Sequence, residues 1–524
     1  MVQLQDRDLL SQQEARELAE RAYTAAQQMR VFSQFEVDRI CQNMAKRGFE
    51  AAEELAKMAA EETGFGKWED KKVKNEFATK SLWEYIKDLK TVGFLDPEGA
   101  VRRIAEPMGV VAGIIPSTNP TSTAMYKAII SLKSRNSAVM SPHPAAAKCI
   151  LKAVEWLHEA AEEAGAPKDA LLCMTVAELP GAHELMSHPK VGVILATGGT
   201  GLVKAAYSAG KPAYGVGPGN VPAFIEKTAD AEKAVKDIIL SKCFDNGTVC
   251  SSEQSIITDI SLDQTVRRLL IEYKCHFCSP EEIKLLEKIM LLPGQKINPR
   301  IVGQSSYHIA QRAGFSVAED TTMLIVEIGG VGADYPLSVE KLSPVICYFT
   351  ADGWEEGCEL CLKIINYGGL GHTMTLHTKD NEVVERFALE KPVMRVLVNT
   401  PSTHGAIGYS TGLAPSLTLG CGTWGGSITA DNVTPMHLLN IKRLAYETEP
   451  LNPPKTRIAA AGKTKWRYDE QYRYRPMTDE VFKRDTTAVK PDGKKDAPLV
   501  SKTYGEGISE TQVAEIIRTF KKRV

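Results

Sequence analysis

The residue best placed to do chemistry is Cys250, in a polar, glycine-broken turn at 243–254. The turn separates an amphipathic helical pattern from a strand-like run at 255–258. Cysteine attacks a carbonyl carbon only as a thiolate, which requires partial exposure and an electropositive setting such as the peptide N–H groups of a turn. An aldehyde is therefore a suitable target. The alternative for any single cysteine is a thiol that fills the core.

A second candidate is Asn119, which follows the apolar run 109–115 and precedes Pro120 and a helical pattern. An amide donor at the carboxyl end of a parallel strand can hold the oxyanion that forms when a nucleophile adds to a carbonyl. An Asn before a Pro is also a common helix start, and for Asn119 alone that structural interpretation is favoured.

A third element is the glycine-rich turn Thr197-Gly198-Gly199-Thr200-Gly201, between the apolar run 191–196 and a helical pattern. Small residues there let a dinucleotide phosphate approach the helix N-terminus, where free N–H groups and the helix dipole favour an anion. The spacing is not G-x-G-x-x-G, and a tight strand-to-helix turn is the default explanation. The run 215–220 is likewise either a turn or the wall of a narrow passage.

The elements that must position these residues alternate between strands and helices. Residues 8–90 have helical periodicity. Continuous apolar runs then form two series, at 109–115, 138–140, 171–175 and 191–196, and at 255–258, 323–327, 344–349, 374–377 and 393–398. Strands that are apolar on both faces belong to parallel sheets covered by helices. The sequence predicts an α/β fold with two doubly wound domains and a catalytic cleft at their junction.

The composition is that of an ordinary globular protein. The chain has 524 residues, 43% of them hydrophobic, and a formal net charge of -2, which argues against a nucleic-acid partner. Residues 1–7 lack the features of a secretory leader, and no 18-residue apolar segment follows. We expect a cytoplasmic protein without a membrane partner.

The 11 cysteines are expected to stay reduced in that compartment. Two Cys-x-x-Cys pairs, Cys275 with Cys278 and Cys358 with Cys361, raise the question of zinc. Both pairs lie in helix-like stretches without a turn that would present them as a knuckle. We expect packed helix cysteines and no metal site.

The C-terminal part differs from the rest of the chain. Residues 451–524 carry 17 Lys and Arg against 10 Asp and Glu. An extension and polar linker at 447–507 leads to 508–524, which opens with a capping-box pattern and continues as an amphipathic helix. Such a helix either folds back on its own chain or docks on a separate partner.

Seven segments together resemble the aldehyde dehydrogenase superfamily, specifically its coenzyme-A-acylating branch. They occur in the family's order across roughly residues 10–446. The segments are 115–120, 139–144, 197–199, 244–250, 340–344, 369–373 and 418–426.

The resemblance implies a catalytic set centred on the thiol. Cys250 would be the nucleophile, and Asn119 would hold the oxyanion together with the backbone N–H of Cys250. His372 is an auxiliary candidate, for which proton transfer and a structural hydrogen bond both remain open.

The resemblance also implies a dinucleotide site, with NAD expected rather than NADP. Thr197, Gly198 and Gly199 would line its pocket. Ser141 and Pro142 would lie beside the adenosine portion. Glu340 would approach the nicotinamide ribose.

One difference from the pattern of the acid-releasing enzymes indicates which branch of the superfamily this chain resembles. Aldehyde dehydrogenases that release free acids have a water-activating glutamate in the segment that matches 215–220, and this chain has no carboxylate there. A thioester on Cys250 would then persist until the thiolate of coenzyme A arrives. The sequence thus predicts oxidation of a short aldehyde, acetaldehyde or propionaldehyde, to an acyl-CoA. The alternatives are a hydrolytic aldehyde dehydrogenase and a non-catalytic scaffold that binds a shell.

The family pattern further implies domains and partners. A dinucleotide-binding domain would cover 1–240, a catalytic domain 241–426, and an oligomerisation arm 98–107 with 427–446. We expect a homo-oligomer, dimer or tetramer. Residues 508–524 resemble the peptides that direct such enzymes to shell proteins, which implies the lumen of a bacterial microcompartment.

Overall fold

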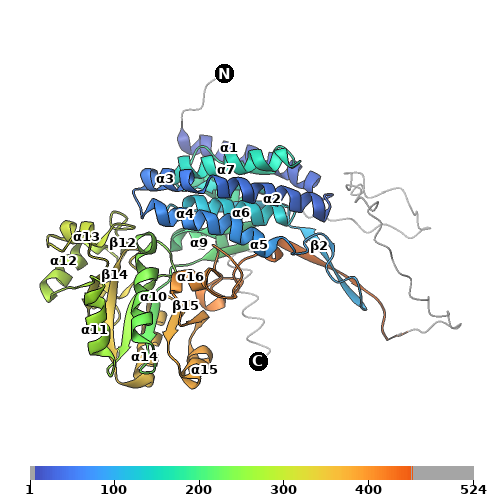
Figure 1. Ribbon diagram of the computed structural model, residues 1–524. Helices are drawn as coiled ribbons and strands as arrows, with labels where there is room; N and C mark the ends of the chain where they lie inside the picture. The colour runs from blue at the N-terminus through green and yellow to red at the C-terminus, as the bar shows by residue number, and fades with distance from the viewer. Residues whose placement is uncertain (1–5, 295, 450, 452–524) are drawn as a thin grey trace, which may run out of the picture. The chain divides into compact units, whose positions relative to one another are not determined.

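The computed structural model describes residues 6–294, 296–449 and 451. It opens with a helical region whose apolar positions recur every three or four residues, as the sequence predicts, and are buried. Helix α2 packs on α7 (Ala147–Glu163), both labelled in Figure 1, whereas α1 packs mainly on α8 (Leu179–Ser187). The elements are α1 (Arg7–Met29), α2 (Gln34–Glu50), α3 (Ala52–Thr63), α4 (Trp68–Glu76), a π-helical turn (Phe77–Ser81) and α5 (Leu82–Ile86).

The first sheet has five strands in the order β5-β4-β3-β6-β7, all parallel. Its strands are β3 (Val110–Ile115), β4 (Ser137–Pro142), β5 (Leu171–Cys173), β6 (Val191–Thr197) and β7 (Ala213–Val216). The connecting helices are α6 (Pro120–Lys133), α7, α8 (Leu179–Ser187) and α9 (Thr200–Ser208). The strand order reverses between β3 and β6, and ligands of open α/β sheets bind beyond the carboxyl ends of strands at such a point.

The second sheet has seven parallel strands in the order β10-β13-β14-β9-β8-β15-β16. They are β8 (Val221–Ile225), β9 (Glu253–Asp259), β10 (His276–Phe277), β13 (Leu324–Glu327), β14 (Val345–Ala351), β15 (Gly371–His377) and β16 (Val393–Val398). Its helices are α10 (Ala231–Cys243), α11 (Asp263–Glu272), α12 (Pro280–Met290), α13 (Ser306–Ala313), α14 (Gly353–Gly368), α15 (Asn381–Glu390) and α16 (Ser402–Ala406). The two doubly wound α/β units expected from the sequence are therefore present.

The change from one sheet to the other comes earlier than the expected boundary at 240. Strand β8 pairs with β9 and β15 of the second sheet, so the chain crosses between 216 and 221. The sequence analysis missed β8 because its run is short and contains Pro222. The connection 217–220 is therefore the link between the sheets.

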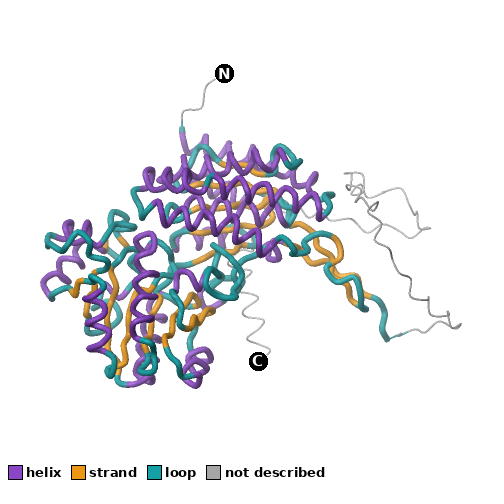
Figure 2. Tube along the Cα trace, in the orientation of Figure 1, coloured by secondary structure: helices purple, strands orange, loops and turns teal. Residues whose placement is uncertain are grey.

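Two small sheets complete the described fold. Strands β1 (Gly93–Phe94), β2 (Val101–Pro107) and β17 (Leu439–Ala445) form an antiparallel sheet in the order β1-β2-β17. Figure 2 shows β2 and β17 running together away from the helical layer. Strands β2 and β17 lie within the ranges 98–107 and 427–446 expected to form a strand-bearing arm, whose role in oligomerisation stays a prediction. Strands β11 (Leu291–Leu292) and β12 (Lys296–Ile297) form a hairpin.

No helix among the described residues is long and apolar enough to cross a membrane. The extension at 452–507 and the expected helix at 508–524 lie outside the described residues. The expectation that both Cys-x-x-Cys pairs are helical is wrong for one of them. Cys275 and Cys278 flank strand β10, whereas Cys358 and Cys361 lie on α14.

Candidate active site

The turn that carries Cys250 is shaped by three consecutive left-handed residues. Helix α10 ends at Cys243, and the chain then adopts φ 49° at Asp245, 52° at Asn246 and 74° at Gly247. Asn, Asp and Gly tolerate this conformation best, so the sequence suits a turn that most residues would strain. The Asn246 side chain donates to the Gly303 carbonyl at 2.9 Å, which holds the turn in place.

Cys250 follows this turn and is partly exposed. Burial of the sulfur raises the pKa of the Cys250 thiol to about 12, and the nearby charge of Glu340 adds to the shift. Arg395 and the backbone N–H of Cys250 itself oppose the shift. The resting thiol is therefore protonated at neutral pH and must lose its proton as it attacks a carbonyl.

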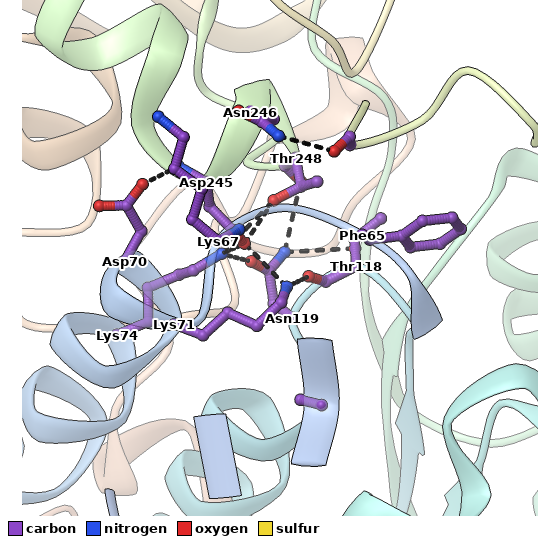
Figure 3. A network of polar contacts seen from close by, with 12 residues as sticks. Phe65, Lys67, Asp70, Lys71, Lys74, Thr118, Asn119, Asp245, Asn246 and Thr248 are labelled. Atoms are coloured by element: carbon purple, nitrogen blue, oxygen red, sulfur yellow. Dashed lines mark hydrogen bonds and ion pairs between the residues drawn. The ribbon is translucent and has the colours of Figure 1, made fainter. Parts of the chain in front are cut away.

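Asn119 occupies the helix-start position that its sequence indicates, but its side chain does something else. It is the N-cap residue of α6, yet within the described residues its side chain makes no capping hydrogen bond. Its Nδ2 donates to the Thr248 carbonyl at 3.5 Å, and its Oδ1 accepts from Lys74 at 2.6 Å (Figure 3). The amide donor thus faces the turn of Cys250, two residues before the sulfur.

Gly219 joins the remaining catalytic candidates. A Cβ built on Gly219 would lie 2.2 Å from the Cys250 carbonyl oxygen and 3.2 Å from the His372 ring. Its N–H donates to Oε1 of Glu340 at 3.1 Å. The chain therefore brings Cys250, His372 and Glu340 around one residue of the connection between the sheets.

Glu340 brings a carboxylate beside the segment 215–220, which the sequence of that segment alone does not indicate. The segment 215–220 itself lacks one, but Glu340 contacts it from elsewhere in the chain. Burial raises the pKa of Glu340 to about 7, so near neutral pH the group is divided between its acid and carboxylate forms. Both a cofactor contact and proton transfer are open to such a group.

His372 is buried on strand β15, and its Nδ1 pairs with the Thr373 hydroxyl at 3.0 Å. Its Nε2 has no hydrogen-bond partner in the part of the chain that the structure describes. Burial, aided by the charge of Arg395, lowers the pKa of His372 to about 3. The ring is therefore neutral at physiological pH and does not store a proton.

Five of the six residues expected to bind the dinucleotide, Ser141, Pro142 and 197–199, lie at the carboxyl edge of the first sheet, whereas the sixth, Glu340, lies beside Gly219. Ser141 and Pro142 end β4, and Thr197 ends β6 across the intervening strand β3. The Thr197 hydroxyl oxygen is buried without a partner among the described residues. A Cβ on Gly199, the N-cap of α9, would meet nothing within 4 Å. An open turn at a helix N-terminus, beside a hydroxyl without a described hydrogen-bond partner, fits a dinucleotide phosphate.

The candidate residues come from the carboxyl edge of the first sheet and the amino edge of the second. Asn119 and Thr197 lie beyond the carboxyl ends of β3 and β6, whereas Cys250, Gly219 and His372 lie at the amino ends of β9, β8 and β15. The hydrogen bond between Asn119 and Thr248 links the two edges.

Sequence reasoning missed several residues around this site. In the sequence, Lys71 and Lys74 on α4 resemble the solvent-facing lysines of an amphipathic helix. Their pairing with Asp245 has no local pattern because Asp245 is far away along the chain. Arg395 on β16 donates to carbonyls of His372 and Gly420 and to the Asn432 side chain, so it braces the segment behind the site. For Asp245, the Asp-Asn-Gly sequence is a local pattern that favours a left-handed turn and could have indicated this residue.

One group among the described residues has ligand atoms close enough to hold a metal. His276, Cys278 and Glu282 offer atoms within 4.8 Å of one another, but the Glu282 carboxylate already accepts from His276 at 3.0 Å and from the Ser279 N–H as a helix cap. These contacts give each of the two polar residues a structural role.

The geometry can be set beside known proteins. The model of the aldehyde dehydrogenase family matches residues 4–275. The bifunctional aldehyde-alcohol dehydrogenase of Escherichia coli (strain K12) is 44% identical over 440 residues, which cover 82% of this chain and 49% of that protein. This chain spans about half the length of the curated aldehyde-alcohol dehydrogenases that it matches.

Two solved structures share most of their length with this chain. An acetylating aldehyde dehydrogenase from Geobacillus thermoglucosidasius is 47% identical, with a TM-score of 0.84, and the match covers 86% of this chain and 100% of that one. A propionaldehyde dehydrogenase from the fucose utilisation bacterial microcompartment of Clostridium phytofermentans is 26% identical, with a TM-score of 0.74 over 83% and 98% of the two chains.

Proposed function

The chain belongs to the aldehyde dehydrogenase family, and we propose that it is an NAD-dependent, CoA-acylating member that converts a short aldehyde to an acyl-CoA. The observation that carries this proposal is the contact of the Asn119 amide with the turn of Cys250, through the Thr248 carbonyl, beside a connecting segment, 217–220, that has no carboxylate of its own.

In the first half-reaction the Cys250 sulfur forms a bond to the aldehyde carbon as the thiol loses its proton. The carbonyl π electrons move to oxygen, where the Asn119 amide and the Cys250 N–H stabilise the resulting charge. Collapse of this oxyanion expels the hydride and leaves an acyl thioester on Cys250. The residues at 197–199 would hold the dinucleotide phosphate, and NAD, when bound, would supply the hydride acceptor.

In the second half-reaction the CoA thiolate adds to the thioester carbonyl, and the Cys250 thiolate leaves. The sum is aldehyde, NAD⁺ and CoA to acyl-CoA, NADH and a proton. The same oxyanion donors serve both additions because both create negative charge on the same oxygen.

A hydrolytic dehydrogenase is the second candidate, and Glu340 is the observation that favours it. Its carboxyl group lies one hydrogen bond from Gly219, whose Cα packs on the Cys250 carbonyl. With a pKa raised to about 7 by burial, Glu340 is a base of suitable strength for activating water. Activation of water by Glu340 would compete with the role expected for Glu340 at the nicotinamide ribose.

The deciding experiment mixes the enzyme with NAD and aldehyde but no CoA and follows NADH in a single turnover. We expect one equivalent of NADH, an acyl mass on the Cys250 peptide and little free acid, followed by acyl-CoA when CoA is added. Steady release of carboxylic acid without CoA would establish the hydrolytic alternative. Absence of any NADH would point to a non-catalytic scaffold.

Finer features of the proposal have their own tests. NAD and NADP are separated by their kcat/KM values, and acetaldehyde and propionaldehyde by the same measurement, because one methylene changes pocket preference by only ~1 to 3 kcal/mol. The arm of β2 and β17 supports a dimer or tetramer, which light scattering measures.

We also propose that 508–524 directs the enzyme to the lumen of a bacterial microcompartment by binding shell proteins. Its capping-box pattern and amphipathic face support this, as does the similarity of the described fold to a microcompartment propionaldehyde dehydrogenase. Deleting 508–524 should abolish co-sedimentation with shells and leave kcat unchanged. Unchanged co-sedimentation would show that the segment has another role.

A further inference from the structure

Two lysines lie beside the turn of Cys250 and are buried, which is rare for lysine. Lys71 and Lys74 lie three residues apart on α4 and therefore on one helix face. Their side chains are only 2% and 3% exposed. Lysine is almost never buried to this extent without a partner, so a specific set of contacts must hold these two charges.

Their common partner is the Asp245 carboxylate from the left-handed turn (Figure 3). Its Oδ2 accepts from Lys71 at 2.9 Å and from Lys74, while its Oδ1 accepts from the Lys67 backbone N–H at 2.8 Å. The Asp245 backbone N–H in turn donates to the Asp70 carboxylate at 2.7 Å. Two cations and two carboxylates thus lie together, and helix α4 is tied to the turn.

Lys74 also makes a contact that Lys71 does not. Its Nζ donates to the Asn119 Oδ1 at 2.6 Å, whereas Lys71 donates to the backbone carbonyl of Thr118 at 3.3 Å. An ammonium group has donors and no acceptor, so only the oxygen of the Asn119 amide can face it. A flipped amide would set its N–H groups against the ammonium and lose this hydrogen bond.

We propose that Lys74 is a positioning residue that fixes the Asn119 amide in the one orientation that presents its N–H groups to the turn of Cys250. With its oxygen held by Lys74, the amide directs Nδ2 toward the Thr248 carbonyl at 3.5 Å and the Thr118 hydroxyl at 3.2 Å. Both contacts are long or weak, so they select this orientation less strongly than the charged contact on the other side.

The consequence for catalysis follows from the cost of an unfixed donor. An oxyanion donor is effective because it already points at the position where charge develops, and losing one costs about a hundredfold to a thousandfold in rate. An Asn119 amide free to rotate would spend part of its time with the oxygen toward the reacting carbonyl. This inference rests on the oxyanion role of Asn119 proposed above.

The test is a double-mutant cycle on the full chain, with the rate of NADH formation in a single turnover without CoA as the readout. Lys74→Met should slow this step about tenfold or more with little change in the aldehyde concentration that half-saturates it. In an Asn119→Ala background the same change should cost less than about twofold, because the group that it positions is gone. Equal penalties in the two backgrounds would overturn the proposal.

Lys71→Met is the matched control, since it removes an equally buried ammonium from the same carboxylate without touching the Asn119 side chain. It should leave the single-turnover rate within about threefold of the wild type and be additive with Asn119→Ala. A Lys71→Met rate as low as that of Lys74→Met would show that the ion network acts only as structure. If wild-type protein forms no NADH, the proposed function itself has failed, which separates the two outcomes.

A pH profile provides a readout that does not depend on the folding of any lysine variant. Burial lowers the pKa of Lys74 to about 8, and the groups that face it are Asp245 and Thr248 from the turn, Lys71 and Asp70 from α4, and Asn119. A neutral amine can accept as well as donate, so amide orientation is lost above that pH. The acylation rate should fall through about pH 8 in the wild type and not in Asn119→Ala; the same fall in both would contradict the proposal.

Discussion

The turn of Cys250 and the turn at 197–199 are built in opposite ways. The first is enclosed: Asp245 is held by two buried lysines, Asn246 by a backbone carbonyl, and Gly219 packs on the Cys250 carbonyl. The second is open, since a Cβ on Gly199 would meet nothing within 4 Å and the Thr197 hydroxyl oxygen is unpartnered among described residues.

Under the proposed function, this difference matches the partner proposed for each turn. A nucleophile and its oxyanion donor need fixed geometry before substrate arrives, so their surroundings are filled by the protein. A cofactor that binds and leaves must supply the missing contacts itself, so its turn is left open. Changes in the enclosed turn should therefore act on the rate of chemistry, and changes in the open turn on cofactor affinity.

The largest effect is expected from Cys250→Ala, which removes the group that forms the covalent bond. Turnover should fall by at least about a thousandfold, because the covalent bond to the substrate can no longer form at this position. Steady-state NADH formation measures the loss, and NAD binding, measured by fluorescence titration, should persist. Substantial activity in this variant would rule out the assigned role.

The same methyl group placed in each turn provides the sharpest contrast. Gly219→Ala sets a Cβ 2.2 Å from the Cys250 carbonyl oxygen, so the nucleophile must shift, and kcat should fall by about a hundredfold. Gly199→Ala, with negative φ and open space around it, should leave kcat within about twofold. Similar losses in the two variants would break the comparison.

Thr197→Val should affect binding rather than chemistry. The substitution keeps the shape but removes the hydroxyl that has no described partner, so the KM for NAD should rise about threefold to tenfold while kcat changes little. The melting temperature without cofactor should stay the same or rise, since a buried unsatisfied hydroxyl is lost. An unchanged KM would place the dinucleotide elsewhere.

The smallest effect is a pH-dependent change in stability at Glu340. Because burial raises its pKa from the usual value to about 7, the folded protein keeps a proton there that the unfolded chain has released. Stability contributed by this group is therefore present at low pH and lost as pH rises through about 7. Glu340→Gln should raise the melting temperature at pH 8 by a few degrees and change it little at pH 5. An equal gain in melting temperature at the two pH values would contradict the raised pKa of Glu340.

The sequence predicted the scaffold well because continuous apolar strands and alternating helices have short-range patterns. It missed β8, whose run is short and contains Pro222, and therefore set the change of sheet too late. Its local patterns also selected Cys250 and Asn119, which the structure brings to neighbouring positions through the Thr248 carbonyl; their catalytic roles stay predictions.

The environment of the site could not be predicted in the same way. Lys74 on α4 reaches Asn119 and Asp245 across 45 and 171 residues of chain, and helical spacing alone gives such a lysine a solvent-facing role. The approach of Glu340 to Gly219 across 121 residues likewise depends on how the segments that precede β14 and β8 meet at one edge of the second sheet. Contacts of this kind have no local pattern in a single sequence.

The short connection at 217–220 has a mechanical consequence. It is the stretch through which the chain passes from the first sheet to the second, and its Gly219 also packs on the Cys250 carbonyl and donates to Glu340. Any rotation of one sheet against the other would bend this tether and would therefore also displace the residue that packs on the Cys250 carbonyl. Movement between the sheets and the placement of the proposed nucleophile would thereby be coupled through a single glycine.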